Sequence, residues 1–129
     1  MQTEEMPQSL IQVSRESGIE LIVSRTIIDF GVPPHVRGYQ YIREALLMLM
    51  EDRDYILCIA KDIYPYIALK FYSSPLRVEL AIRHAVEISW DGRGRLDPKN
   101  HFSENSVRPT NSEFLIFTRN WIYTTVANN

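Results

Sequence analysis

The side chains best suited to chemistry gather on one side of a single segment, residues 75–90. When this segment is wound at about 100° per residue, its apolar residues fall on one side and its charged residues on the other. The polar side carries Arg77, Glu79, Arg83, His84 and Glu87. Exposed side chains of these types can exchange hydrogen bonds with base edges in the major groove of DNA. Leu80 falls near the middle of this polar side and offers only an apolar contact.

The element that positions these side chains is a helix with a well-marked start. Ser74 is a suitable N-cap, because its hydroxyl can accept a hydrogen bond from an amide of the first turn, and Pro75 suits the first helical position. Upstream, residues 65–71 predict a short helix and residues 72–74 a tight turn. These are the parts of a helix-turn-helix, which lays its second helix in the major groove. The pattern also fits an ordinary helical hairpin whose charges form a solvated ladder.

The other elements also have helical patterns. Gly31 and the prolines after it predict the end of a first helix over residues 19–30. A second helix is predicted over residues 39–52 and a third over residues 54–62. The buried stripe of the second helix should hold Tyr41, Ile42, Ala45, Leu46 and Leu49. No stretch alternates with a period of two residues, so we expect an all-α fold of about six helices that contains the helix-turn-helix.

The two ends of the chain differ in character. Residues 1–17 are polar and aperiodic, which predicts a flexible tail or linker remnant ahead of a domain over residues 18–129. Residues 91–109 are rich in Gly, Pro, Asn and Ser and predict a long loop. The last helix should begin at Thr110, which can form a capping box with Glu113.

Composition limits the type of protein. The chain has 129 residues and is 45% hydrophobic, the size and character of one folded domain. No apolar run approaches the ~20 residues of a membrane helix, and no signal peptide is visible. The single cysteine, Cys58, lies in an apolar stretch and is predicted to be buried. The histidines are not spaced as metal ligands, and no nucleophile motif or phosphate loop occurs, so we expect neither an enzyme nor a metal or cofactor.

Three ordered blocks of the sequence carry a resemblance to one family. They are GVPPHVRGYQYIREA at residues 31–45, RVE and AIRHA within residues 77–85, and RPTNSEF at residues 108–114. The blocks resemble the effector domain of the sporulation master regulator, stage zero sporulation protein A. The resemblance implies a DNA-binding transcription regulator of sporulation initiation in the bacterial cytoplasm. In that family the exposed face of the helix reads a short DNA box upstream of sporulation genes.

The base-contacting positions of the family can be assigned to matching residues of this chain. The resemblance implies that the base-contacting positions are Arg77, Glu79, Leu80, Arg83 and His84. Arg83 is expected to donate to guanine, and Glu79 to accept from a cytosine amino group. The family has an arginine where Leu80 stands, and losing one bidentate guanine contact costs about 1–3 kcal/mol at one base pair. The chain therefore either reads the family's box poorly or reads a different box.

Contacts with the DNA backbone are expected from the turn and the long loop. Residues 65–95 hold five cations and three anions, a net charge of +2, whereas the whole chain carries −2. Because DNA affinity depends on neutralising phosphates, binding must rely on this local basic face. The expected phosphate-contacting residues are Lys70, Ser73, Ser74, Arg93, Arg95 and Arg108. Solvation alone explains the loop charges equally well.

The partners that the resemblance implies are double-stranded DNA, RNA polymerase and a second copy of the domain on tandem sites, with no membrane. The receiver domain that precedes the effector domain in this family has no counterpart here. We therefore expect either an excised effector domain or a natural stand-alone relative. A competing interpretation is an interaction module that has lost specific DNA binding and modulates a full-length regulator or RNA polymerase. Leu80 and the net negative charge favour that interpretation.

Overall fold

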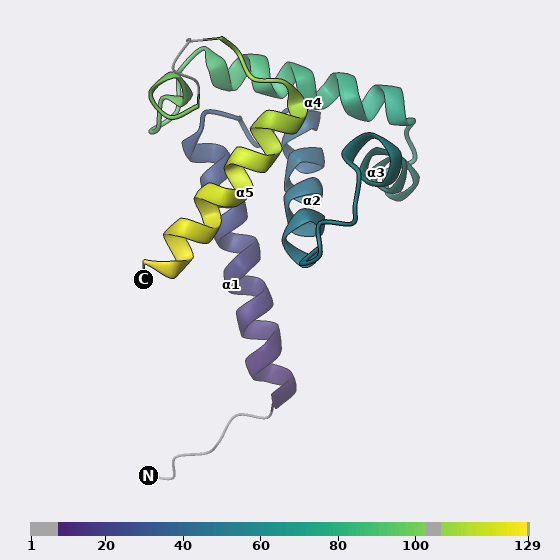
Figure 1. The fold of residues 1–129 in the computed structure, drawn as a ribbon, viewed down its shortest axis with the longest axis vertical. Helices are drawn as coiled ribbons and strands as arrows, with labels where there is room; N and C mark the ends of the chain where they lie inside the picture. Colours follow the sequence, from purple (N-terminus) through teal and green to yellow (C-terminus); the bar gives the residue numbers. More distant parts are fainter. Residues whose placement is uncertain (1–7, 103–106, 129) are drawn as a thin grey trace.

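The fold is a small bundle of helices. The computed structural model describes residues 8–102 and 107–128, and within them it contains five α-helices and no strand (Figure 1). The helices are α1 (Gln8–Asp29), α2 (Arg37–Glu51), α3 (Tyr64–Lys70), α4 (Pro75–Trp90) and α5 (Asn111–Ala127). A single π-helical turn, η1 (Ile59–Ile63), leads into α3, and a 3₁₀ turn, η2 (Pro98–Asn100), lies in the loop after α4. The prediction of an all-α fold is confirmed, with five helices rather than six.

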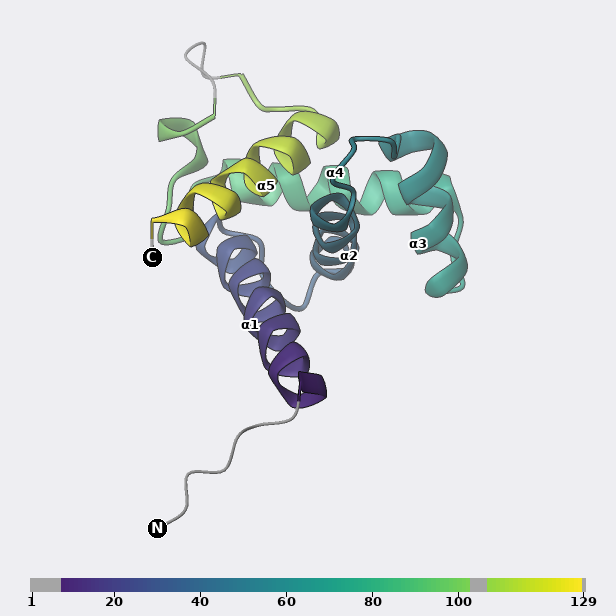
Figure 2. The same cartoon turned by 60° about the horizontal axis from the view of Figure 1, so that its bottom comes forward.

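One helix lies across an end of the molecule and the others pack beneath it. Figure 1 shows α4 spanning this end, with α2, α3 and α5 against its underside, and in Figure 2 the same helix lies behind α2 and α5. The N-terminal part of α1 projects away from the other helices in both views. Fully buried core side chains are Val23, Ile27, Ile42, Leu46, Ile63, Ile67, Ile82, Leu115 and Ile122. The core therefore draws on all five α-helices and on η1.

The close approach of α2 to α4 depends on small residues. The predicted stripe of α2 is buried, which confirms that prediction. At its N-terminal end, a β-carbon added to Gly38 would lie 2.7 Å from the Ala85 side chain and closer still to the Ala81 carbonyl oxygen. Only glycine fits at this position without moving one of the helices. Gly38 thus fixes where α4 sits on the domain.

The first helix is longer than predicted and ends where predicted. It begins at Gln8 rather than Ile19, so residues 8–17, which we expected to be part of a tail, are helical. Those residues lack the apolar periodicity that predicts a helix. Gly31 has a φ of +92°, and the amide of Val32 donates to the carbonyl of Ile27 at 3.2 Å, the geometry that ends many helices. The division into a tail and a domain stays a prediction.

The predicted third helix is wrong for residues 54–58. The carboxylate of Asp52 accepts hydrogen bonds from the amides of Ile56, at 3.0 Å, and Leu57, at 2.7 Å. Tyr55, which lies between Asp52 and Ile56, has a φ of +54°, outside the region of a right-handed helix. Side chains that bond to nearby amides offer the backbone an alternative to a helix, and here that alternative prevails.

The single cysteine lies at the end of this irregular segment. Cys58 is exposed, so the prediction that it is buried is wrong. Its amide donates to the carboxylate of Asp62 at 2.7 Å, which caps the turn that leads into α3. Because the segment is not helical, the apolar stretch around Cys58 has no continuous buried face.

The long loop after α4 is held by aromatic side chains. The ring of Phe102 lies 4.0 Å from that of Phe117 and 5.6 Å from that of Phe30, measured between centroids. The amide of Leu96 donates to the carbonyl of Asp29 at 2.7 Å. These contacts fix the loop to the C-terminal end of α1 and to the middle of α5; residues 103–106 of the predicted loop lie outside the described residues. The capping box of Thr110 and Glu113 at the start of α5 is confirmed.

Candidate nucleic-acid interface

The helix-turn-helix predicted from the sequence is present. Helix α4 begins at Pro75 and ends at Trp90, as predicted, and the Ser74 hydroxyl accepts from the amide of Arg77 at 3.2 Å. The turn between α3 and α4 is tight, because the amide of Ser73 donates back to the carbonyl of Ala68 at 2.8 Å. Tyr72 adopts a φ of +54° in this turn. The turn therefore sets the direction in which α4 leaves α3.

The inner face of α4 anchors the helix to the domain. Its buried residues are Val78, Ile82, Ala85, Val86 and Ser89. The Ser89 hydroxyl donates to the carbonyl of Phe30 at 2.5 Å, a bond between residues that are 59 positions apart. Ala81 and Ile88, predicted on the same side, are half-buried at its edge. The division of the helix into two sides was thus predicted correctly.

The outer face of α4 consists of Leu76, Arg77, Leu80, Arg83 and His84. All five side chains are exposed, and they lie opposite the inner face on the helical wheel. Glu79 is half-buried at the edge of this face next to α5, and Glu87, also half-buried, lies on the same side of the helical wheel one turn beyond Arg83. The structure thus brings the expected base-contacting residues together on one surface, with Glu79 at its edge.

The edge of this face next to α5 is built from residues that the sequence analysis did not single out. The side-chain amide of Asn111 donates to the carbonyl of Glu79 at 3.0 Å and to the hydroxyl of Tyr64 at 3.2 Å. One side chain at the start of α5 thereby ties together α3 and α4. Burial raises the pKa of Tyr64, so its hydroxyl stays protonated at neutral pH. Nothing in the sequence could predict this contact, because Asn111 lies 32 residues from Glu79.

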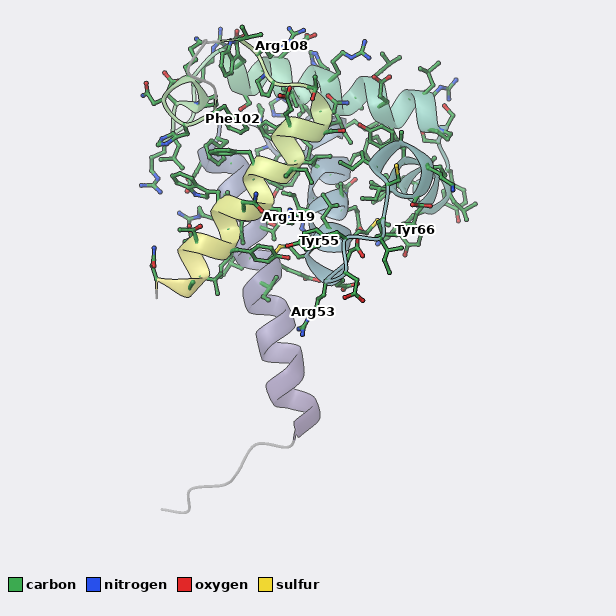
Figure 3. The ribbon with its side chains drawn as sticks, viewed as in Figure 1. Arg53, Tyr55, Tyr66, Phe102, Arg108 and Arg119 are labelled. Atoms are coloured by element: carbon green, nitrogen blue, oxygen red, sulfur yellow. The ribbon has the colours of Figure 1, made fainter. Side chains whose placement is uncertain are left out.

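Most of the cations expected to face DNA are paired with carboxylates in the free protein. Arg83, an expected base-contacting residue, pairs with Glu79. Arg108, an expected phosphate-contacting residue, pairs with Glu87 at 3.5 Å. Figure 3 shows Arg108 beside α4, where the loop returns toward α5. Exposed pairs of this kind are worth only about 0–1 kcal/mol, so a phosphate or a base can replace the carboxylate.

The cations at the two ends of α4 are paired in the same way. Near its N-terminal end, Lys70 bonds to Glu44 at 2.6 Å, and this bond raises the pKa of Lys70. Beyond its C-terminal end, Arg95 bonds to Asp29 at 3.1 Å, which raises the pKa of Arg95. Both side chains therefore remain charged at neutral pH. In the part of the chain that the structure describes, Arg93 is exposed and has no carboxylate partner.

The expected phosphate-contacting residues thus bracket the outer face. Ser73, Ser74 and Lys70 lie at the N-terminal end of α4, while Arg93 and Arg95 follow its C-terminal end. A helix that enters the major groove meets a phosphate backbone on each side. The arrangement can therefore neutralise phosphates around a central set of side chains that can reach base edges.

A short helix, a tight turn and a helix with an exposed polar face define the class of helix-turn-helix DNA-binding domains. Residues 23–122 match the family described as Sporulation initiation factor Spo0A C terminal, and the match covers most of the chain. The chain therefore belongs to this family of DNA-binding sporulation regulators. The family is one of regulatory domains and not of enzymes. Within the described residues, none of the helices is long and apolar enough to cross a membrane.

Proposed function

We propose that this chain controls sporulation genes by reading a short DNA box with the outer face of α4 in the major groove. The observation that supports this most strongly is the outer face itself, which is exposed although the opposite face is tightly packed. An ordinary helical hairpin needs no such set of arginine and histidine side chains at one end of the domain. The proposal explains why they occur together.

The pair formed by Arg83 and Glu79 is proposed to make the hydrogen bonds of base recognition. The two residues are one helical turn apart, and their ion pair holds the guanidinium along the helix surface before DNA arrives. In the complex, Arg83 donates to O6 and N7 of a guanine, and Glu79 accepts from the amino group of a cytosine. Arg77 and His84 flank them on the other side of the outer face.

Affinity, as distinct from sequence preference, comes from the cations around the outer face. The chain as a whole carries a charge of −2, so attraction to DNA depends on the orientation of its basic face. Lys70, Arg93, Arg95 and Arg108 exchange carboxylates or water for phosphates on binding and release counterions from the DNA. RNA polymerase and a second copy on a tandem site are proposed as partners of this bound state.

A salt-dependent binding assay tests the proposal. Fluorescence anisotropy of labelled duplexes, one carrying the box that the chain selects from a random pool and one of random sequence, would be measured between about 50 and 200 mM salt. Affinity for both should fall steeply and linearly on a logarithmic scale, and the box should remain preferred throughout. Arg95→Ala should weaken both duplexes alike and reduce the salt slope by about one.

The matched control is Arg53→Ala. Arg53 is exposed and lies on the side of the molecule away from α4 (Figure 3). Its removal takes away the same charge but should leave the salt slope unchanged. Equal losses in the two variants, or binding without any sequence preference, would favour the interaction module over the DNA reader.

A further inference from the structure

The centre of the outer face is apolar. Leu76 is 65% exposed and Leu80 is 46% exposed, and the two are one helical turn apart. The inner-face residues Val78 and Ile82 point to the opposite side of α4 and are fully buried. The two leucines therefore lie on the side of α4 that faces away from the core. We call Leu76 and Leu80 the leucine pair.

From this position we infer that the leucine pair recognises thymine methyl groups, so that the DNA box of this chain contains two thymines. The inference rests on the proposed function and deepens it. The thymine methyl is the apolar group that the major groove presents, and leucine has no hydrogen bond to offer any other base edge. A leucine placed against a guanine or adenine edge would remove water from their acceptors without replacing it.

The surroundings of the leucine pair favour DNA over a protein partner. Arg77, Arg83 and His84 surround the pair on the same face, and all three are exposed. An apolar contact enclosed by cationic and hydrogen-bonding side chains complements thymine methyls enclosed by phosphates. The family that the chain resembles has an arginine at the position of Leu80. Leucine in its place would replace a guanine contact with a thymine contact.

The spacing of the leucine pair predicts the spacing of the thymines. Four residues of helix advance by about 6 Å, which is close to two base-pair steps of about 3.4 Å. For a helix that follows the groove, the two thymines should lie about two base pairs apart. The guanine proposed for Arg83 should follow on the side of the Leu80 thymine, because Arg83 is three residues farther along α4.

Substitution of deoxyuridine for thymidine tests this inference directly, because uracil pairs as thymine does but lacks the methyl group. The duplex would be the tightest binder selected from a random pool by the full chain, with each thymine replaced in turn. Two replacements about two base pairs apart should each weaken binding roughly three- to tenfold. Leu76→Ala and Leu80→Ala should each lose sensitivity to one of these two replacements.

The matched control is Leu69→Ala, which removes an 80% exposed leucine of α3 outside the outer face and should retain both sensitivities. Thermal unfolding of the three variants should be close to that of the wild type, since the side chains removed are exposed.

If the selected duplex is preferred but no replacement weakens it, the inference is wrong and the proposed function stands. If no duplex is preferred over random sequence, the proposed function fails and this inference with it. If the leucine variants leave DNA binding unchanged but abolish self-association in sedimentation experiments, the pair contacts protein and the inference is overturned.

Discussion

The two sides of α4 differ in what they contact, although they belong to the same helix. The inner face is enclosed by α2 through Gly38 and bonded to the end of α1 through Ser89. On the outer face, by contrast, Arg83 forms an ion pair with Glu79 of the same helix. Packing thus dictates the residue types of the inner face, while the outer face can change without cost to the fold. Substitutions on the two sides should therefore separate stability from DNA recognition.

The largest effect is expected from Gly38→Val. The added side chain would overlap the backbone of α4 at Ala81, so α2 and α4 must separate. The free energy of unfolding should fall by about 3 kcal/mol or more, as measured by urea denaturation. Gly18→Ala is the control, because nothing lies within 4 Å of the added β-carbon in α1. That variant should be as stable as the wild type or slightly more stable; equal stability of the Gly38 variant would refute the close packing.

A smaller loss of stability is expected from Ser89→Ala. The substitution leaves the buried carbonyl of Phe30 without its hydroxyl donor, which costs about 1–3 kcal/mol. Once the lower fraction of folded protein is taken into account, the preference for one DNA sequence over another should be unchanged. A changed preference would show that the inner face also determines recognition, and the contrast between the two sides would then fail.

The outer face should give the opposite result. Arg83→Ala should remove about 1–3 kcal/mol of discrimination at one base pair and weaken binding to random duplex much less. Stability should change by only a few tenths of a kcal/mol, because the ion pair with Glu79 is solvent-exposed. Competition between specific and random duplexes, alongside urea denaturation, measures both quantities. Equal losses for the two duplexes would exclude Arg83 as a base reader.

The smallest change in stability is expected from Glu113→Gln, at the start of α5. The amide of Thr110 holds the pKa of Glu113 below its usual value of 4.5. A lowered pKa in the folded state stabilises the protein above the pKa of the unfolded state, and this stability is lost as the pH falls through the folded value. The stability advantage of the wild type over Glu113→Gln should thus be constant near neutral pH and shrink below about pH 4.5. An advantage that grows on acidification would contradict the capping box.

The sequence predicted the helix-turn-helix well because local signals and periodicity agree there. Ser74 and Pro75 mark the start of α4, and its apolar residues repeat with the helical period. The segment after α2 was misjudged because Asp52 bonds to backbone amides, a local competition that periodicity does not reveal. Contacts such as that of Asn111 with Glu79 join distant parts of the chain and are visible only in the folded structure.

If the outer face of α4 lies against base edges in the major groove, Leu80→Arg should change which base is preferred. Duplexes would be selected from a random pool by the wild type and by the variant, and affinities for the family's box and random duplex compared. We expect the preferred base at one position to change from thymine to guanine. Affinity for the family's box should rise by roughly ten- to a hundredfold, and random duplex should gain only what one added charge supplies. An equal gain for both duplexes, with no change in the selected sequence, would contradict this placement of the outer face.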